Sequence, residues 1–276
     1  PLYFLVISSL LNIVLDLVFI LTFGMGIGGA AWATVLSQLL SAILSTLFGA
    51  KKFQVLRLRR ADFKNMHKDM IIHLKTGFPM GFQMSVMCIG QLAMQAAVNA
   101  IGPEAIAGYT AATKVDQLSV LINNAFGVAI ASYVAQNYGA GRWDRIRSGV
   151  KAGLIQTEIV NIFLCALILG GRNLVVPMFI DNPTAEIIGY ANGYLLSVAP
   201  FYLLLGLLLI VRSSVQSMGN GKAPFAACIT ELILRIAATF GLQYLLGYVG
   251  ICLASPIAWF GASLLLVVVY CTMIKK

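Results

Sequence analysis

An aspartate, an asparagine and a serine share one helical face in the first apolar stretch of this sequence. Ser8, Asn12 and Asp16 are spaced four residues apart, so a helix over residues 2–23 would align them in one polar stripe. A carboxylate inside an apolar segment is costly, which makes Asp16 a candidate functional residue. Oxygen atoms around a single carboxylate can hold a sodium ion or a proton. The alternative is a set of structural hydrogen bonds between helices, which Thr34 in the next segment could join.

A second stripe lies in residues 76–101, where methionines and amides recur at helical spacing. Methionine is flexible and polarizable, so it suits a surface that must fit many ligands. Uncharged amides can line a wet cavity without selecting one substrate. We expect this face to line a substrate cavity, with ordinary apolar packing as the alternative reading. The residues concerned are Met84, Met87, Gln91 and Gln95.

Charged residues also occur within the later apolar segments. Glu231 and Arg235 are four residues apart, so they could neutralise each other or line the cavity as a pair. Lys114 and Asp116 lie about 200° apart on a helix, so both cannot fully face one cavity. Either of these two could contact substrate. Arg212 lies near a segment end, where we expect its side chain to snorkel toward water.

The composition excludes several classes of protein. Of the 276 residues, 59% are apolar and 11% are charged, and the mean hydropathy is +0.88. A soluble domain carries roughly 25% charged residues, so we exclude an ordinary cytosolic enzyme, a disordered chain and a nucleic-acid-binding module. The five cysteines are scattered singly, which argues against disulfides and zinc. Because no catalytic or nucleotide-binding motif is present, we expect neither an enzyme nor a cofactor.

Eight long apolar segments predict an all-α, polytopic transmembrane bundle, because helices satisfy their own backbone groups inside lipid. Pro200 and Pro256 fall within the sixth and eighth segments, where they predict kinks. The segments cover residues 2–23, 27–50, 76–101, 105–136, 149–170, 190–216, 224–246 and 250–274.

The distribution of basic residues predicts the orientation of these segments. The stretch Lys51–Lys75, the turns at 137–151 and 217–222, and the C-terminus hold 15 of the 19 Lys and Arg residues. Positive charge marks the cytoplasmic side, so these stretches and the C-terminus are predicted to be cytoplasmic. The net charge of +9 is therefore a topological signal, with attraction to anionic lipid as a secondary effect.

The pattern Asn12-x3-Asp16, followed by a Gly-Ala-Thr segment, resembles the fifth and sixth helices of the multidrug and toxic compound extrusion (MATE) family of transporters. Later motifs resemble its second lobe, and the similarity extends over essentially the whole chain. The motifs are Gly26-x-Gly28-Gly29-Ala30-Ala31-x-Ala33-Thr34, Gly77-Phe78-Pro79, Gln136-Asn137-x-Gly139-Ala140-Gly141-Arg142, Gly219-x-Gly221, Glu231-x3-Arg235 and Gly250-Ile251.

The resemblance implies a fold and an activity. It implies a twelve-helix, two-lobe exporter of which this chain is a fragment, helices five to twelve. Residues 1–50 would close the first lobe, 51–75 would form a basic cytoplasmic loop, and 76–276 would form the second lobe. Such a protein, expected to be a monomer in the plasma (inner) membrane, exchanges cationic or amphipathic drug-like compounds for H⁺ or Na⁺ by alternating access.

The resemblance also implies where the coupling ion binds. In members with a first-lobe cation site, the matching ligands are Asn12, Asp16, Thr34 and the backbone of Ala30. Many members carry acids in the seventh and tenth helices, but residues 76–101 and 190–216 contain none. We therefore expect coupling in the first lobe. The alternative function is a lipid-linked oligosaccharide flippase of the same superfamily, which would need several cationic residues in its cavity.

Overall fold

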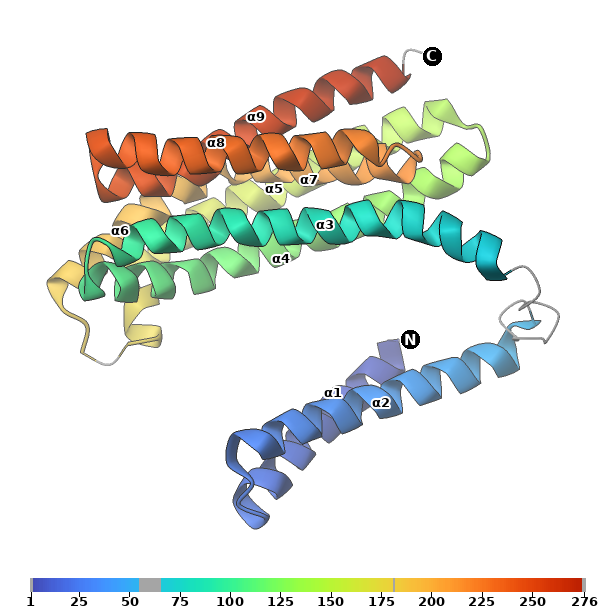
Figure 1. Cartoon of the computed structure of the whole chain (residues 1–276), viewed down its shortest axis with the longest axis horizontal. Helices are drawn as coiled ribbons and strands as arrows, with labels where there is room; N and C mark the ends of the chain where they lie inside the picture. The colour runs from blue at the N-terminus through green and yellow to red at the C-terminus, as the bar shows by residue number, and fades with distance from the viewer. Residues whose placement is uncertain (1, 55–65, 181, 275–276) are drawn as a thin grey trace. The chain divides into compact units, whose positions relative to one another are not determined.

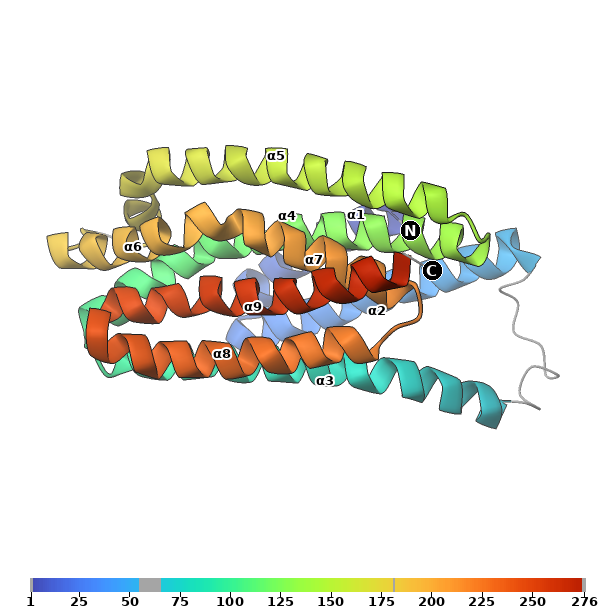
Figure 2. The ribbon, with the colours of Figure 1, turned by 90° about the horizontal axis from the view of Figure 1, so that it is seen from above.

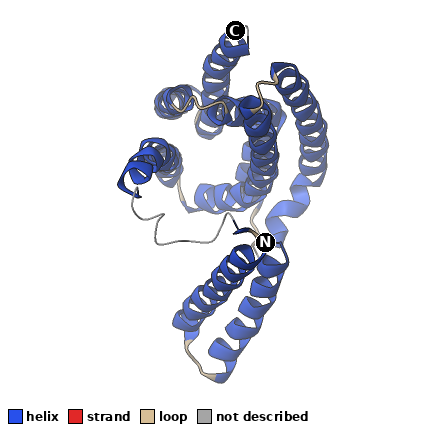
Figure 3. Ribbon diagram, turned by 90° about the vertical axis from the view of Figure 1, so that its right-hand side faces the viewer, coloured by secondary structure: helices blue, strands red, loops and turns tan. Residues whose placement is uncertain are grey.

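The computed structural model describes residues 2–54, 66–180 and 182–274. Nearly all of these residues are helical, and none of them lies in a strand (Figure 3). The all-α prediction is thus confirmed. The chain divides into two compact units, Pro1–Ile72 and His73–Lys276. The assignment of residues 1–50, 51–75 and 76–276 to a lobe, a loop and a second lobe stays a prediction.

The first unit is a helical hairpin, coloured blue in Figure 1. Helix α1 (Leu2–Leu17) continues as a short π-helix, η1 (Val18–Thr22), and helix α2 (Gly26–Lys52) returns alongside it. Gly24 and Gly26 have φ of +64° and +55°, which side-chain-bearing residues rarely adopt, so the tight reversal depends on glycine. A Cβ on Gly29 would lie 2.9 Å from the Cβ of Phe19, so this glycine lets the two helices approach closely.

The second unit contains the remaining helices, several of which run roughly alongside one another (Figure 2). Helix α4 packs against α5, α6 and α7, while α8 and α9 form a hairpin whose second arm contacts α6 and α7. The helices are α3 (Met66–Asn99), which begins in the first unit, α4 (Pro103–Gly139), α5 (Trp143–Val175), η4 (Val176–Met178), α6 (Ala185–Val198), η5 (Ala199–Phe201), α7 (Tyr202–Ser217), α8 (Lys222–Leu246) and α9 (Tyr248–Ile274).

The broken helix α6–η5–α7 forms the centre of this unit. In its most apolar window 67% of the residues are buried, against 28% or fewer in the other candidate membrane spans of the described residues. Pro200 lies in the 3-10 turn η5 between the two halves, which confirms the kink predicted for this segment. Pro256, in contrast, lies inside a continuous helix, α9.

Each apolar segment predicted from the sequence falls on a helix or on the broken helix. Seven helical spans among the described residues are long and apolar enough to cross a membrane, counting α1–η1 and α6–η5–α7 each as one. Helix α3 is not among those seven, because glutamines interrupt its apolar part. Helix α3 also begins at Met66, so it occupies part of the stretch 51–75 that we expected to be a loop. Residues 55–65 of that stretch lie outside the described residues.

Candidate functional site

Thr34 connects the predicted ion-site residues of the first unit. The Asn12 amide nitrogen on α1 donates to the Thr34 hydroxyl on α2 at 3.5 Å. The Thr34 hydroxyl in turn donates to the backbone carbonyl of Ala30 at 3.0 Å, one turn earlier on the same helix. The hairpin therefore brings an amide, a hydroxyl and a backbone carbonyl together from two antiparallel helices.

Asp16 lies on the same face of α1, one turn after Asn12. The side chain is partly buried, and its Oδ1 is buried with no hydrogen-bond partner among the described residues. A buried carboxylate oxygen without a partner is costly, and a proton or a cation would relieve that cost. Carboxylate, hydroxyl and carbonyl oxygens are the ligands that hard cations prefer, so the residues present fit H⁺ or Na⁺.

The other end of the polar stripe binds the two helices together. Ser8 is buried and its hydroxyl donates to the carbonyl of Ser37 at 2.7 Å. The Ser37 hydroxyl donates to the carbonyl of Thr34 at 3.0 Å. The first of these is an interhelical hydrogen bond of the kind expected under the structural alternative, and the second lies within α2. They fix the register of the hairpin and so place Thr34 opposite Asn12.

A cluster of buried charges occupies the second unit. Both carboxylate oxygens of Glu231 on α8 accept hydrogen bonds at 2.7 Å, one from Arg212 on α7 and the other from Arg235 one turn away. The three residues are 3–8% exposed. Arg235 also donates to the Ser255 hydroxyl on α9 at 2.9 Å. We call Arg212, Glu231 and Arg235 the charge triad, which joins α7 to α8 and, through Ser255, to α9.

The prediction for Arg212 was wrong. Its side chain does not reach water but is buried against Glu231, because α7 and α8 are joined by a short turn. Arg212 lies five residues before the end of α7 at Ser217, and Glu231 lies nine residues after the start of α8 at Lys222. The four-residue difference corresponds to about 6 Å of depth, which an arginine side chain spans. The contact between Arg212 and Glu231 could therefore have been predicted from the number of residues that separates each of them from the α7–α8 turn.

The predicted substrate-cavity residues separate into two groups. Met87 of the predicted stripe places its sulfur 3.9 Å from the Arg212 guanidinium, and Met94, seven residues later on α3, places its sulfur 3.7 Å from that of Arg235. These two methionines therefore cover the charge triad. Gln95 donates to Asn99 at 2.8 Å along α3. The remaining predicted cavity residues have exposed side chains and take no part in the buried triad: Met84, Gln91 and Lys114.

Asp116 takes part in a contact that the sequence did not reveal. Its carboxylate on α4 accepts a hydrogen bond from the Tyr202 hydroxyl at 2.8 Å and another from the Tyr194 hydroxyl at 3.2 Å. Tyr194 lies in α6 and Tyr202 begins α7, so the two tyrosines flank the break at Pro200. We call this arrangement the aspartate clasp. Lys114, two residues away, is exposed, as their angular separation predicts.

The comparisons with known proteins agree with this architecture. Residues 79–241, more than half of the chain, match the family model described as MatE. The chain belongs to the MatE family. Among the solved structures, the MATE transporter VcmN from Vibrio cholerae in its bent form matches 99% of the chain and 62% of its own length, with a TM-score of 0.87 and 15% identity. At that identity, the likeness to this MatE structure shows the fold alone.

Two curated relatives come from Bacillus subtilis. A probable multidrug resistance protein of Bacillus subtilis, YpnP, is 29% identical over 88% of this chain and 52% of its own length. A second one from the same organism, YoeA, is 26% identical over 100% of this chain and 61% of its own length. The chain therefore spans about half to three-fifths of the length of these relatives.

Proposed function

We propose that this chain forms helices five to twelve of a cation-coupled exporter of drug-like molecules. Its substrates would be cationic or amphipathic compounds, and it would work by alternating access in the cytoplasmic membrane as a monomer, with its C-terminus in the cytoplasm. MatE membership and the multidrug resistance proteins among its relatives support export of such compounds. The coupling ion would be H⁺ or Na⁺.

The observation that carries the coupling proposal is the buried, unpartnered oxygen of Asp16, one helical turn from Asn12, whose amide donates to Thr34. An ion arriving from outside would neutralise Asp16 and contact the oxygens around it. The neutralised and charged forms would favour different arrangements of the α1–α2 hairpin, because a buried charge is costly. Drug release and ion binding would then be linked through their different affinities for the two arrangements.

The flippase alternative loses support from the charge triad. A cavity for a large anionic headgroup needs several free cations, whereas both arginines of the triad bind Glu231. Among the described membrane segments, Lys114 is the basic residue of the predicted cavity that such a headgroup could still use.

The test uses the complete twelve-helix protein reconstituted in vesicles. Efflux of a fluorescent cation is followed while the proton and sodium gradients are collapsed separately. We expect efflux to stop with one of the two gradients and to fall to the protein-free background in Asp16→Asn. Glu186→Gln, an exposed carboxylate at the start of α6, is the matched control and should transport normally. Gradient-driven efflux that persists in Asp16→Asn would overturn the proposal.

Thr34 offers a second, graded test of the same site. Thr34→Val removes the hydroxyl and keeps the shape, whereas Thr34→Ser keeps the hydroxyl. We expect the valine variant to need a higher ion concentration for half-maximal efflux and the serine variant to behave like the unmodified protein. Equal ion dependence in both variants would exclude Thr34 as a ligand.

A further inference from the structure

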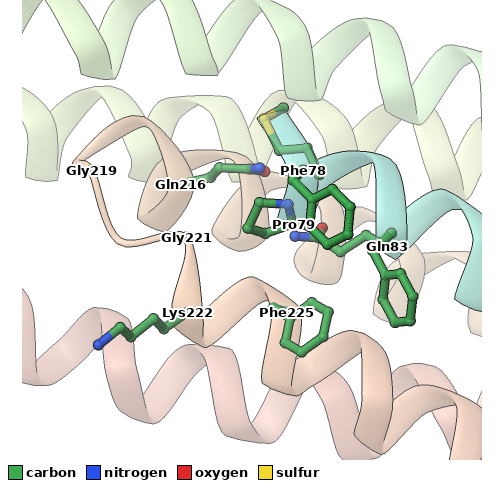
Figure 4. A pocket seen from close by; sticks show the side chains of 10 residues that line it. Phe78, Pro79, Gln83, Gln216, Gly219, Gly221, Lys222 and Phe225 are labelled. Carbon is green, nitrogen blue, oxygen red and sulfur yellow. The ribbon is translucent and has the colours of Figure 1, made fainter. Parts of the chain in front are cut away.

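The second unit contains a cavity outside the charge triad and the aspartate clasp. Its volume is about 640 Å³, and it lies between the early part of α3 and the turn that joins α7 to α8 (Figure 4). Pockets that bind small molecules typically measure about 300–1,000 Å³, so the cavity has the size of a ligand site. On the predicted topology, the α7–α8 turn places it at the cytoplasmic side.

Aromatic rings form one wall of this cavity. The rings of Phe78 and Phe82 stack with their centroids 6.4 Å apart, and Phe82 contacts Phe225 of α8 at 5.8 Å. Phe78 is 72% exposed and lines the cavity. The Gly219–Gly221 turn leaves the opposite side free of bulky groups, because a Cβ at either glycine would meet nothing within 4 Å. An apolar body fits between the rings and the turn.

A buried hydrogen-bond donor faces this apolar space. The Gln83 side chain is 7% exposed, and its Nε2 is buried with no partner in the part of the chain that the structure describes. Figure 4 shows its amide directed into the cavity between Pro79 and Phe225, with the Gln216 amide approaching from α7. The backbone carbonyl of Gln83 accepts the Cys228 thiol at 3.4 Å, which fixes this turn of α3 to α8. The unsatisfied donor is therefore held in place and needs an acceptor.

The polar groups define the chemistry of the ligand. The ten described lining residues include no acid and one cation, Lys222, which lies at the edge with its side chain directed away from the rings (Figure 4). Organic cations, the class expected for the exported drugs, would find no counter-charge among them. We propose that this cavity binds an amphipathic molecule with an aromatic or hydrocarbon body and a hydrogen-bond-accepting head, neutral or anionic. This site is separate from the coupling site proposed at Asp16.

The experiment uses a photoreactive aromatic acid, 4-benzoylbenzoate, with the purified complete protein in detergent. Cross-linked peptides are mapped by mass spectrometry, which separates this site from binding to micelles. We expect saturable labelling of the peptides that contain Phe78–Gln83 and Lys222–Phe225. A cationic analogue of the probe, 4-benzoylbenzylamine, should label these peptides far less.

Two matched variants test the role of the buried amide. Gln83→Leu removes the donor but keeps the volume, a change that need not destabilise the fold because an unsatisfied group is lost. We expect this variant to need a roughly three- to tenfold higher probe concentration for half-maximal labelling, which corresponds to the loss of one hydrogen bond. Gln156→Leu, the same change at an exposed site on α5, should bind like the unmodified protein. Gel filtration confirms that both variants are folded.

The source of the natural ligand is decided by a second arm in lipid nanodiscs. If anionic phosphatidylglycerol discs abolish labelling and neutral phosphatidylcholine discs do not, a lipid headgroup supplies the acceptor. Labelling that persists in both kinds of disc points to a soluble amphiphile. Labelling that does not saturate, maps elsewhere, favours the cationic probe or ignores Gln83→Leu would overturn the proposal. None of these results depends on Asp16, so the two proposals fail separately.

Discussion

Glu231 carries a single carboxylate and forms ion pairs with two buried arginines, so both ion pairs of the triad require this one side chain. We predict that Glu231→Gln lowers the stability of the folded protein by about 3–5 kcal/mol, because it leaves both guanidinium groups buried without a charged partner. The measurement is the midpoint temperature of aggregation of the detergent-solubilised protein. Glu186→Gln, which changes an exposed carboxylate on α6, is the control. A midpoint for Glu231→Gln equal to that of the control contradicts the prediction.

The sequence predicted local pairs of residues better than distant ones. Glu231 and Arg235 are four residues apart on one helix, so their contact follows from helix geometry alone. Asn12 and Thr34 are 22 residues apart but lie in one hairpin, so their approach could also be inferred. Tyr194 and Tyr202 lie 78 and 86 residues from Asp116, and no periodicity in the sequence indicates that contact. The roles of the predicted site residues in coupling and substrate binding stay predictions.

At the scale of the helices, the aspartate clasp holds the two halves of α6–η5–α7 in one arrangement. A side-chain hydrogen bond contributes about 0.5–1.5 kcal/mol to stability, and Pro200 removes a backbone hydrogen bond at the same place. We predict that Asp116→Asn increases hydrogen–deuterium exchange in the peptide around residues 196–204. Asp144→Asn is the control, because Asp144 forms an exposed ion pair with Arg142. Unchanged exchange in Asp116→Asn would show that the break is held by packing alone.

Helix positions were the most predictable feature of the elements, because each apolar run is long and ends at turn residues. Gly219 and Gly221 mark the α7–α8 turn as predicted, and Gly247 alone separates α8 from α9. The start of α3 was not predictable from hydropathy, since polar residues from Met66 onward extend the helix beyond its apolar part. Backbone hydrogen bonds do not require apolar side chains, so a polar helical extension leaves no hydropathy signal.

At the scale of the whole molecule, the basic residues predict which turns face the cytoplasm. In a cysteine-free version, Glu186→Cys should react with a membrane-impermeant maleimide in intact cells. Arg145→Cys should react only after the membrane is permeabilised. Both positions are exposed, so access to reagent and not burial decides the result. Labelling of Arg145→Cys in intact cells would invert the predicted topology.

The charge triad also has a consequence for biosynthesis. A lone arginine or aspartate at the centre of a spanning helix costs about 2.5–3.5 kcal/mol during insertion by the translocon. Glu231 and Arg235 leave the ribosome on one helix and can offset each other as that helix enters the bilayer. Arg212 is synthesised on the helix immediately before them. No charge of the triad is therefore separated from its partner by more than the synthesis of one further helix.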